Sequence, residues 1–213
     1  SAPSGALRAF DARTGEFRWG FDPIPRRKGE PQAGDWTPES MATTGGANAW
    51  SLLSVDEQRD LVFVPTSSAS PNWFGGTRPG DNRYANSVVA LRGKTGDVVW
   101  SFQTVHHDVW DWDTPAQPLL ADVPRDGRSV PAVIVLTKQS LVFVLDRETG
   151  RPLFPVEERP VPTDGVAGDV LSKTQPFPVE PPPLMKTRLT PDAAWGLTFW
   201  DQTRGRDLIA GLV

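Results

Sequence analysis

The amino-acid sequence predicts an all-β fold. Three observations support this class: a hairpin-like pattern occurs three times, no long stretch follows the 3.6-residue apolar period of a helix, and turn-forming residues are abundant. The 213 residues include 19 Gly, 22 Pro and 9 Trp. Gly and Pro separate short elements, whereas Trp adds a large flat area to a β core. We therefore expect many short strands, with few and short helices.

The repeated pattern consists of a strand, a turn closed by Thr-Gly, and a second strand with an aromatic residue at a fixed distance after the glycine. The pairs of glycine and aromatic residue are Gly15 with Trp19, Gly96 with Trp100, and Gly150 with Phe154. Glycine supplies the positive φ angle that such turns need. The copies are unevenly spaced, so insertions separate them. Repeated hairpins of this kind predict a β-propeller or a related radial array.

Further apolar runs lie between the copies. Residues 49–55 and 61–65 form one pair of expected strands, and residues 132–136 and 140–144 form another, each pair joined by a polar turn. Together with the repeated hairpins they make units of the size of a propeller blade. We therefore expect residues 1–154 to consist of blade hairpins.

The composition changes after the last hairpin. Prolines crowd into residues 155–192, and because proline cannot donate to a β-ladder, we expect a Pro-rich excursion that runs extended across the surface of the blades. Residues 193–213 open another apolar stretch, which predicts the start of a further blade element. Residues 1–213 would then be part of one propeller domain. The apolar end and the lack of a signal sequence predict a fragment of a larger repeat protein.

The charge and cysteine counts exclude several classes of function. The 22 Lys and Arg against 26 Asp and Glu give a formal net charge of -4, without a basic block or stripe, which argues against a nucleic-acid partner. No apolar run approaches the roughly 18 residues of a membrane-spanning helix. The absence of cysteine excludes disulfides and thiolate metal sites from this chain.

The stretch richest in chemical groups is residues 104–113, with the sequence TVHHDVWDWD, which contains both histidines of the chain. It directly follows a strand-like run at residues 98–102, so we expect a loop at the end of a strand. Loops on a rigid scaffold often carry functional residues. Aspartates in such a loop can also be turn formers whose side chains bond their own backbone. The composition by itself leaves both interpretations open.

An ordered set of motifs resembles one family. The motifs are GGANAW at residues 45–50, RPGDNRY at 78–84, FQTVHHDVWD at 102–111, TKQ at 137–139, VFVLDR at 142–147 and VEERPVP at 156–162. They are similar, in the same order, to those of the pyrroloquinoline-quinone (PQQ) dehydrogenases, in the branch of membrane-bound glucose and quinate dehydrogenases. The resemblance implies an eight-bladed propeller with the quinone on its axis, of which this chain would cover about three blades.

The resemblance also implies roles for single residues. Asp111 matches the general base that takes the hydroxyl proton of the substrate. Lys138, at the spacing from Asp111 expected for this branch, matches the cation that hydrogen-bonds the reactive quinone oxygens. Trp50 matches the floor under the flat cofactor, and Gly45 and Gly46 would let the backbone approach that cofactor closely. The alternatives are a turn aspartate, an ordinary lysine at a hairpin tip and a core tryptophan.

One position departs from the family pattern. In the calcium-binding members an Asn supplies an oxygen to the metal, whereas Ser68 stands at this position here, and a neutral hydroxyl is a weaker ligand for a hard cation. The resemblance therefore implies a divalent cation, calcium or magnesium, whose identity and binding strength stay open. Asp113 could add a ligand, or it could be a solvated turn carboxylate. His106, His107 and Asn48 are second-tier candidates: the histidines could orient the base or contact the sugar, or they could be packed for structure.

Taken together, the resemblance implies a quinoprotein dehydrogenase that oxidises a sugar or cyclic polyol by hydride transfer to PQQ and passes electrons to ubiquinone or another respiratory acceptor. It implies a periplasmic location, with any membrane anchor in regions outside this chain. One alternative is a non-catalytic propeller that scaffolds outer-membrane assembly, which would have no reason to keep Trp50, Asp111 and Lys138 together. Another is a quinoprotein acting on simple alcohols. Because three blades cannot close a ring, we expect the chain by itself to be inactive.

Overall fold

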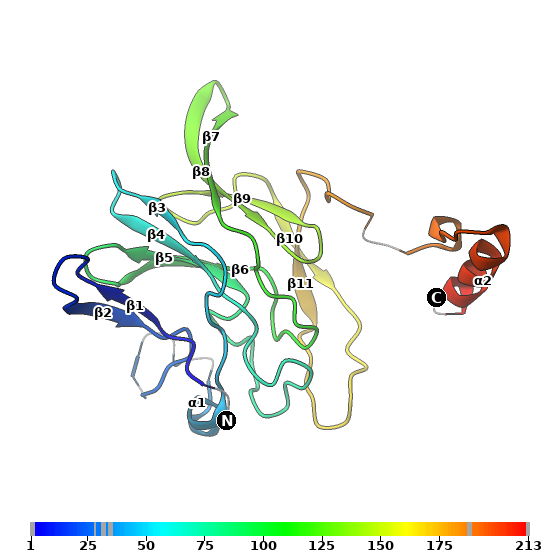
Figure 1. Ribbon diagram of the computed structural model, residues 1–213, viewed down its shortest axis with the longest axis horizontal. Helices are drawn as coiled ribbons and strands as arrows, with labels where there is room; N and C mark the ends of the chain where they lie inside the picture. The colour runs from blue at the N-terminus through cyan, green and yellow to red at the C-terminus, as the bar shows by residue number, and fades with distance from the viewer. Residues whose placement is uncertain (1–2, 28, 31–32, 34–35, 187–188, 212–213) are drawn as a thin grey trace. The chain divides into compact units, whose positions relative to one another are not determined.

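In the computed structural model the chain forms a series of antiparallel β-sheets followed by a helical segment (Figure 1). The structure describes residues 3–27, 29–30, 33, 36–186 and 189–211. The chain divides into two compact units, Ser1–Pro182 and Pro183–Val213. The first unit contains all the sheets of the described chain, and the second contains a helix.

The strands of the first unit pair in chain order, as expected for propeller blades. They are β1 Leu7–Phe10, β2 Phe17–Phe21, β3 Ser54–Asp56, β4 Leu61–Pro65, β5 Ser87–Arg92, β6 Val98–Gln103, β7 Leu119–Arg125, β8 Arg128–Leu136, β9 Val142–Asp146, β10 Val156–Pro160 and β11 Thr174–Pro178. The four-stranded sheet has the order β3-β4-β5-β6 and the three-stranded sheet the order β7-β8-β9, while β1-β2 and β10-β11 are two-stranded. The predicted all-β class and the partial propeller are confirmed.

The Thr-Gly turns close the hairpins as the sequence predicts. The N–H of Gly15 donates to the carbonyl of Asp11 at 2.8 Å between β1 and β2, and the N–H of Gly96 does the same to Arg92 between β5 and β6. The third copy differs, because β9 is followed only by an isolated bridge between Leu145 and Pro152. Proline has no N–H to extend a ladder, so a second strand does not form there.

Each repeat tryptophan packs on the turn of the following blade. The indole Nε1 of Trp19 donates to the carbonyl of Gly93 at 2.9 Å, and that of Trp100 donates to the carbonyl of Arg147 at 3.1 Å. A Cβ built on Gly96 would lie 2.5 Å from the ring of Trp19, and one on Gly150 would lie 2.6 Å from the ring of Trp100. The glycine of each turn is therefore required twice, for its positive φ and for the indole that covers it.

The main apolar core lies between the four-stranded and three-stranded sheets. Phe63 of β4 and Trp100 of β6 pack there with Phe143 of β9, and the two phenylalanines are fully buried. A second cluster joins the β1-β2 hairpin to the four-stranded sheet through Phe21 and Val89. Each sheet thus buries a face against the next one. Truncating a buried phenylalanine here would cost about 3–5 kcal/mol.

The segment between β2 and β4 differs from the sequence expectation in two places. Strand β3 covers only residues 54–56, so most of the expected strand at residues 49–55 is irregular. Before it lies the short helix α1 Pro38–Thr43, whose first turn is capped by the side chain of Thr37 accepting from the N–H of Ser40. Helix α1 and the irregular residues before β3 lead the chain from the first hairpin to the site described below.

The Pro-rich excursion contains a β-hairpin, which the proline content had not predicted. Strand β10 pairs antiparallel with β11, and the prolines at 160, 176 and 178 lie inside these strands. The N–H of Val179 bonds the carbonyl of Pro155, and the N–H of Val161 bonds that of Lys173, so the odd-numbered residues carry the ladder. At the even-numbered prolines the backbone nitrogen faces away from the partner strand, so no N–H donor is required at these positions.

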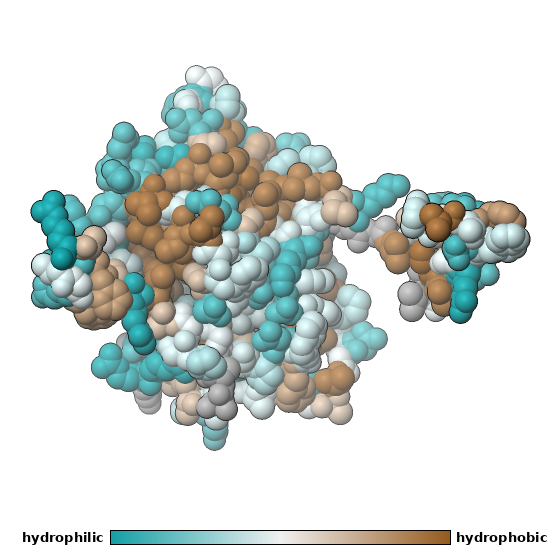
Figure 2. Space-filling model, viewed as in Figure 1, coloured by the Kyte–Doolittle hydropathy of each residue, from teal (hydrophilic) through white to brown (hydrophobic). Residues whose placement is uncertain are grey.

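The second unit is helical where we expected the start of a further blade. It contains the short 3-10 helix η2 Pro191–Ala193 and the helix α2 Phe199–Ala210. Thr198 and Asp201 form a capping box at the start of α2, which favours a helix over a strand. Trp195 and Trp200 are among the large aromatic side chains exposed on this unit, and Figure 2 shows hydrophobic residues on its surface in brown. Within the described residues, neither α2 nor any other helix has the length and apolar character needed to span a membrane.

Candidate active site

The loop that follows β6 is built around the buried side chain of Asp108. Its carboxylate accepts hydrogen bonds from the backbone N–H of Trp110 at 3.0 Å and of Trp112 at 2.8 Å. These are the bonds of an aspartate-centred turn. The two indoles stack on each other with ring centroids 4.9 Å apart. Asp108 therefore fixes the course of the backbone on both sides of Asp111.

Side chains from three other segments hold Asp108. The amide Nδ2 of Asn86 donates to the Asp108 carboxylate at 2.9 Å and to the carbonyl of Trp112 at 3.0 Å. The hydroxyl of Ser68 also bonds this carboxylate, and the buried guanidinium of Arg78 bonds the backbone carbonyl of Asp108. A buried carboxylate needs such partners, because burial without them is costly. The network makes the loop a rigid support.

Asp111 lies in the loop that this network supports, and each of its carboxylate oxygens has a partner. Its backbone has a φ of 59°, in the left-handed region that aspartate tolerates better than most residues. The amide Nδ2 of Asn72 donates to Oδ1 at 2.8 Å, and Nζ of Lys138 lies 3.3 Å from Oδ2. One third of the Asp111 side chain stays exposed. Each carboxylate oxygen can accept more than one hydrogen bond, so a substrate hydroxyl can still be accepted.

Lys138 reaches this loop from the turn between β8 and β9. Its Nζ donates to the backbone carbonyl of Asp111 at 2.5 Å and to Oδ2 of Asp113 at 3.1 Å. Burial disfavours the charged ammonium, but the hydrogen bonds and negative charges of Asp113 and Asp111 outweigh it and raise the pKa of Lys138. The site therefore holds a permanent cation beside a carboxylate over the whole physiological pH range.

Asp113 connects Lys138 to Trp50. Its Oδ1 accepts from the backbone N–H of Ser68 at 2.8 Å, and its Oδ2 accepts from the indole Nε1 of Trp50 at 3.3 Å as well as from Lys138. The Trp50 side chain is fixed at this edge while the residue is 56% exposed. The sequence-predicted trio of Trp50, Asp111 and Lys138 is thus brought together: Asp113 joins Trp50 to Lys138, and Lys138 in turn contacts Asp111.

The two candidate metal ligands are occupied by other partners. The Ser68 hydroxyl bonds Asp108 and Asn86, and both oxygens of Asp113 accept from N–H donors, one of which is the ammonium of Lys138. Among the described residues there is no group of three or more His, Asp and Glu side chains placed to hold a metal ion. A cation at Asp113 would lie beside the positive charge of Lys138. Asp113 acts in this arrangement as an orienting carboxylate, and its role as a metal ligand stays a prediction.

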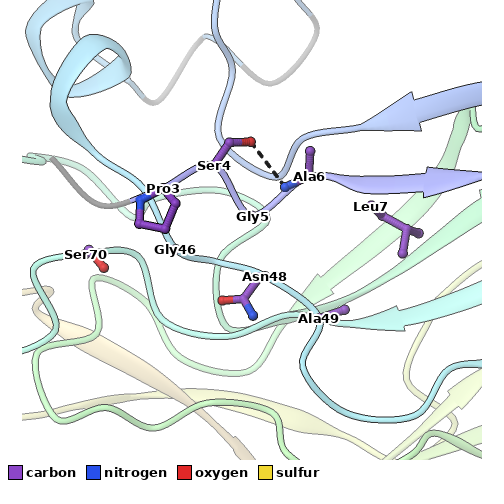
Figure 3. A pocket seen from close by; sticks show the side chains of 9 residues that line it. All are labelled: Pro3, Ser4, Gly5, Ala6, Leu7, Gly46, Asn48, Ala49 and Ser70. Atoms are coloured by element: carbon purple, nitrogen blue, oxygen red, sulfur yellow. Dashed lines mark hydrogen bonds between the residues drawn. The ribbon is translucent and has the colours of Figure 1, made fainter.

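Gly45 and Asn48 contact the segment after β4. The carbonyl of Gly45 accepts from the N–H of Ser70 at 2.9 Å, and the side chain of Asn48 accepts from the Ser67 hydroxyl at 3.2 Å. Gly46 and Asn48 line a hollow of about 510 Å³ together with residues 3–7, as Figure 3 shows. Its lining includes no titratable side chain and neither Asp111 nor Lys138. The hollow is therefore separate from the candidate active site, and the predicted approach of Gly45 and Gly46 to a cofactor stays a prediction.

The two histidines contact the Pro-rich excursion. His106 contacts Gln103 through Nδ1 at 2.8 Å and Glu158 of β10 through Nε2 at 3.1 Å. His107 is buried and contacts Asp169. Within the described chain, no hydrogen bond joins either histidine to Asp111. The structure thus shows structural contacts for both residues, and a role in orienting the base or contacting the sugar stays a prediction.

Sequence reasoning missed several residues of the site. Asn72, which touches the carboxylate of Asp111, lies in a loop with no recognisable motif. Asn86 and Asp108 form the support, and Asp108 could have been found because it lies in the same dense loop as Asp111. Asp169 had no signal at all, because its partner His107 is 62 positions away in the chain. Long-range contacts of this kind leave no local pattern.

Comparison with known proteins identifies what the chain resembles. The family model described as "PQQ: Glucose/ethanol/alcohol dehydrogenase, beta-propeller domain" matches residues 1–212. The chain is 41% identical to the quinoprotein glucose dehydrogenase of Escherichia coli (strain K12) over 204 residues, which cover 93% of this chain and 24% of that protein. It is also 41% identical to the quinate/shikimate dehydrogenase (quinone) of Acinetobacter baylyi, with 94% of this chain and 24% of that protein covered.

A solved structure supports the same relationship. The quinohemoprotein alcohol dehydrogenase from Comamonas testosteroni superposes with a TM-score of 0.65 at 27% sequence identity, covering 83% of this chain and 28% of that one. The chain thus spans about a quarter of the length of the curated relatives described above.

Proposed function

Because the chain belongs to the family of PQQ-dependent dehydrogenases, whose β-propeller model matches residues 1–212, we propose that the full-length protein oxidises a hydroxyl group of a sugar or cyclic polyol. The observation that carries the proposal is the proximity of Asp111, Lys138 and Trp50: Lys138 contacts Asp111 directly and is linked to Trp50 through the carboxylate of Asp113. A carboxylate base, a fixed cation and an accessible flat ring are the groups that such an oxidation needs. A scaffold propeller would not need them in one place.

The residues present fit the family's cofactor. The exposed ring of Trp50 is held at its Nε1 edge by Asp113, so its face is a fixed flat surface for a planar tricyclic molecule. Lys138 donates to the backbone carbonyl of Asp111 at 2.5 Å and to Oδ2 of Asp113 at 3.1 Å, and its third contact, to Oδ2 of Asp111, is longer at 3.3 Å. The hydrogen of this third contact is the one most readily offered to an oxygen of a bound quinone. When bound, PQQ supplies a carbonyl carbon that accepts hydride from the substrate.

Asp111 would take the proton of the substrate hydroxyl onto one of its carboxylate oxygens. Asn72 holds Oδ1 and the backbone carbonyl of Asp111 is tied to Lys138, so the carboxylate cannot rotate freely away from the substrate. Positioning of this kind lowers the barrier because the base need not be brought into place in each turnover. Lys138 stays charged beside it. Burial disfavours the charged ammonium, but the interactions with Asp113 and Asp111 outweigh burial and raise the pKa of Lys138.

The names of the relatives support the substrate class and the acceptor that we propose. One relative is named for glucose, and another is named for quinate and shikimate with a quinone as partner. Glucose is a sugar and quinate a cyclic polyol, so a polyhydroxylated ring is the shared chemistry. We propose the same class of substrate here, and a respiratory quinone such as ubiquinone as the final electron acceptor.

The test is reconstitution of the full-length protein with PQQ, followed by a screen of sugars, cyclic polyols and simple alcohols with a dye acceptor. We expect turnover with a ring polyol and a decrease of about 10²- to 10⁴-fold in kcat for Asp111→Asn, while the variant still binds PQQ. Repeating the assay with a ubiquinone analogue tests the acceptor. A preference for simple alcohols would contradict the substrate class, and a lack of turnover with every donor would contradict the proposed function.

A further inference from the structure

The Pro-rich excursion contacts the Asp111 loop through a buried pair of side chains. Nε2 of His107 lies 2.9 Å from Oδ1 of Asp169, and both side chains are only 2% exposed. Asp169 lies between β10 and β11, whereas His107 lies in the loop that carries Asp111. The contact therefore ties a distant part of the chain to the backbone that positions the candidate base.

Both ring nitrogens of His107 have partners. Nδ1 lies 2.7 Å from the carbonyl oxygen of Gly80, and Nε2 lies 2.9 Å from Oδ1 of Asp169. The ring is therefore held from both sides, and it cannot turn without breaking at least one of these contacts.

The other oxygen of Asp169 is also engaged, because Oδ2 accepts from the backbone N–H of Gly75 at 2.8 Å. Burial alone would raise the pKa of Asp169, but the Gly75 and His107 hydrogen bonds outweigh it and lower that pKa. The buried guanidinium of Arg78 adds a positive charge nearby. The buried cluster thus places the Arg78 guanidinium close to two carboxylates, those of Asp169 and Asp108.

Two glycines next to the pair of His107 and Asp169 leave the space that the pair and the excursion occupy. A Cβ on Gly75 would lie 2.1 Å from Nε2 of His107, and one on Gly76 would lie 2.3 Å from the carbonyl oxygen of Gly168. A side chain at Gly75 would collide with the buried ring of His107, and one at Gly76 would collide with the backbone of the excursion, which resists displacement. His107 itself has a φ of 45°, a left-handed conformation that needs support from its surroundings.

We propose that Asp169 is a positioning residue for the reaction, because it fixes His107 and thereby holds residues 104–113 in the conformation that presents Asp111 beside Lys138. The inference rests on the proposed function for its catalytic readout. It assigns a role in the active site to the Pro-rich excursion, although none of the described residues of the excursion contacts Asp111. Loss of the pair lets the loop move, and a displacement of about 1 Å of a catalytic group can cost roughly 100-fold in rate.

The experiment uses the full-length holoenzyme with the substitutions Asp169→Ala, Asp169→Asn and His107→Gln, and the double variant of Asp169→Ala with His107→Gln. Asp164→Asn, at an exposed position of the same excursion, is the matched control. We expect Asp169→Ala to lower kcat by about 10- to 100-fold with little change in KM or in PQQ binding. The double variant should be no slower than the slower single variant, because both changes remove one interaction.

Multiplicative losses in the double variant, or an unchanged kcat in Asp169→Ala and Asp169→Asn, would overturn the proposal. Hydrogen exchange supplies a readout that needs no activity. Amides of residues 104–113 should exchange faster in Asp169→Asn than in the Asp164→Asn control, while those of β5 stay unchanged. Equal exchange in the loop would also overturn it. An inactive wild-type enzyme would refute the proposed function alone, since the exchange result would still decide whether Asp169 holds the loop.

Discussion

The ammonium Nζ of Lys138 lies 3.1 Å from Oδ2 of Asp113, and this contact sets the position of the cation relative to both Asp111 and Trp50. Asp113 lies on the side of the loop that faces Ser68, so it ties the turn between β8 and β9 to the interior of the preceding blade. The cation and the candidate base thus come from different blades, and a second carboxylate, that of Asp113, fixes the position of the cation.

Asp113→Asn should narrow the pH range of activity. Burial disfavours the charged form of Lys138, but the hydrogen bond and charge of Asp113, followed by those of Asp111, raise the pKa of the ammonium. A raised pKa keeps the cation to higher pH, so removing the Asp113 charge should move the alkaline limb of the kcat/KM profile to lower pH. The same profile measured on Asp122→Asn, an exposed carboxylate on β7, should stay unchanged. An unmoved alkaline limb in Asp113→Asn would show that Asp113 does not govern the charge of Lys138.

Asn72→Ala should slow turnover without abolishing it. The Asn72 amide holds Oδ1 of Asp111 at 2.8 Å, so its loss leaves the carboxylate in place but free to rotate. We expect a decrease in kcat of about tenfold, smaller than that for Asp111→Asn, because one orienting hydrogen bond contributes about 1–1.5 kcal/mol. Steady-state kinetics measure this, with Thr77→Ala, an exposed residue of the same loop, as the control. Equal rates for Asn72→Ala and wild type would show that Lys138 alone orients the carboxylate.

Trp100→Phe should weaken the packing between neighbouring blades. Phenylalanine keeps most of the ring that covers Gly150 but cannot donate to the carbonyl of Arg147. Leaving a partly buried carbonyl without its donor costs about 1–3 kcal/mol, which should lower the apparent Tm. Trp73→Phe is the control, because Trp73 is 70% exposed. If thermal unfolding gave the same Tm for both variants, the indole hydrogen bond would carry no stability.

Asp56→Asn should change how stability depends on pH. Burial alone would raise the pKa of Asp56, but its bonds to Arg147 and Arg59 outweigh burial and lower it. A lowered folded-state pKa means that the stabilisation is present above the unfolded value of about 4 and is lost as the pH falls through the folded value. The Tm difference between wild type and Asp56→Asn should therefore be largest near neutral pH and should shrink below about pH 4. A constant difference across this range would contradict the assignment.

The hairpin turns and the proximity of Trp50, Asp111 and Lys138 were the parts of this molecule that the sequence predicted well. The turns at Gly15 and Gly96 are local, so residue type and spacing suffice to define them. Asp111, Lys138 and Trp50 were grouped through motifs of a family, and the contacts of Lys138 and Asp113 then brought them together in space. The family motifs therefore indicated which distant residues lie together, which a local sequence pattern cannot do.

The parts that were not predicted depend on context that single residues do not show. Prolines at 176 and 178 suggested that no ladder could form, but both fall on the side of β11 that needs no donor, which depends on register. Helix α2 lacks a clear apolar stripe, and only its capping box at Thr198 and Asp201 signals a helix. The buried contact between His107 and Asp169 joins segments 62 positions apart.

The packing of each repeat tryptophan on the next turn has a consequence for synthesis on the ribosome. Trp19 donates to a carbonyl that lies 74 positions later in the chain, and Trp100 to one that lies 47 positions later. At about 5–20 residues per second, Trp19 waits roughly 4–15 s before its acceptor has been made. Each nascent blade therefore leaves the exit tunnel with an unsatisfied indole and an uncovered apolar edge, which the following blade covers as it emerges.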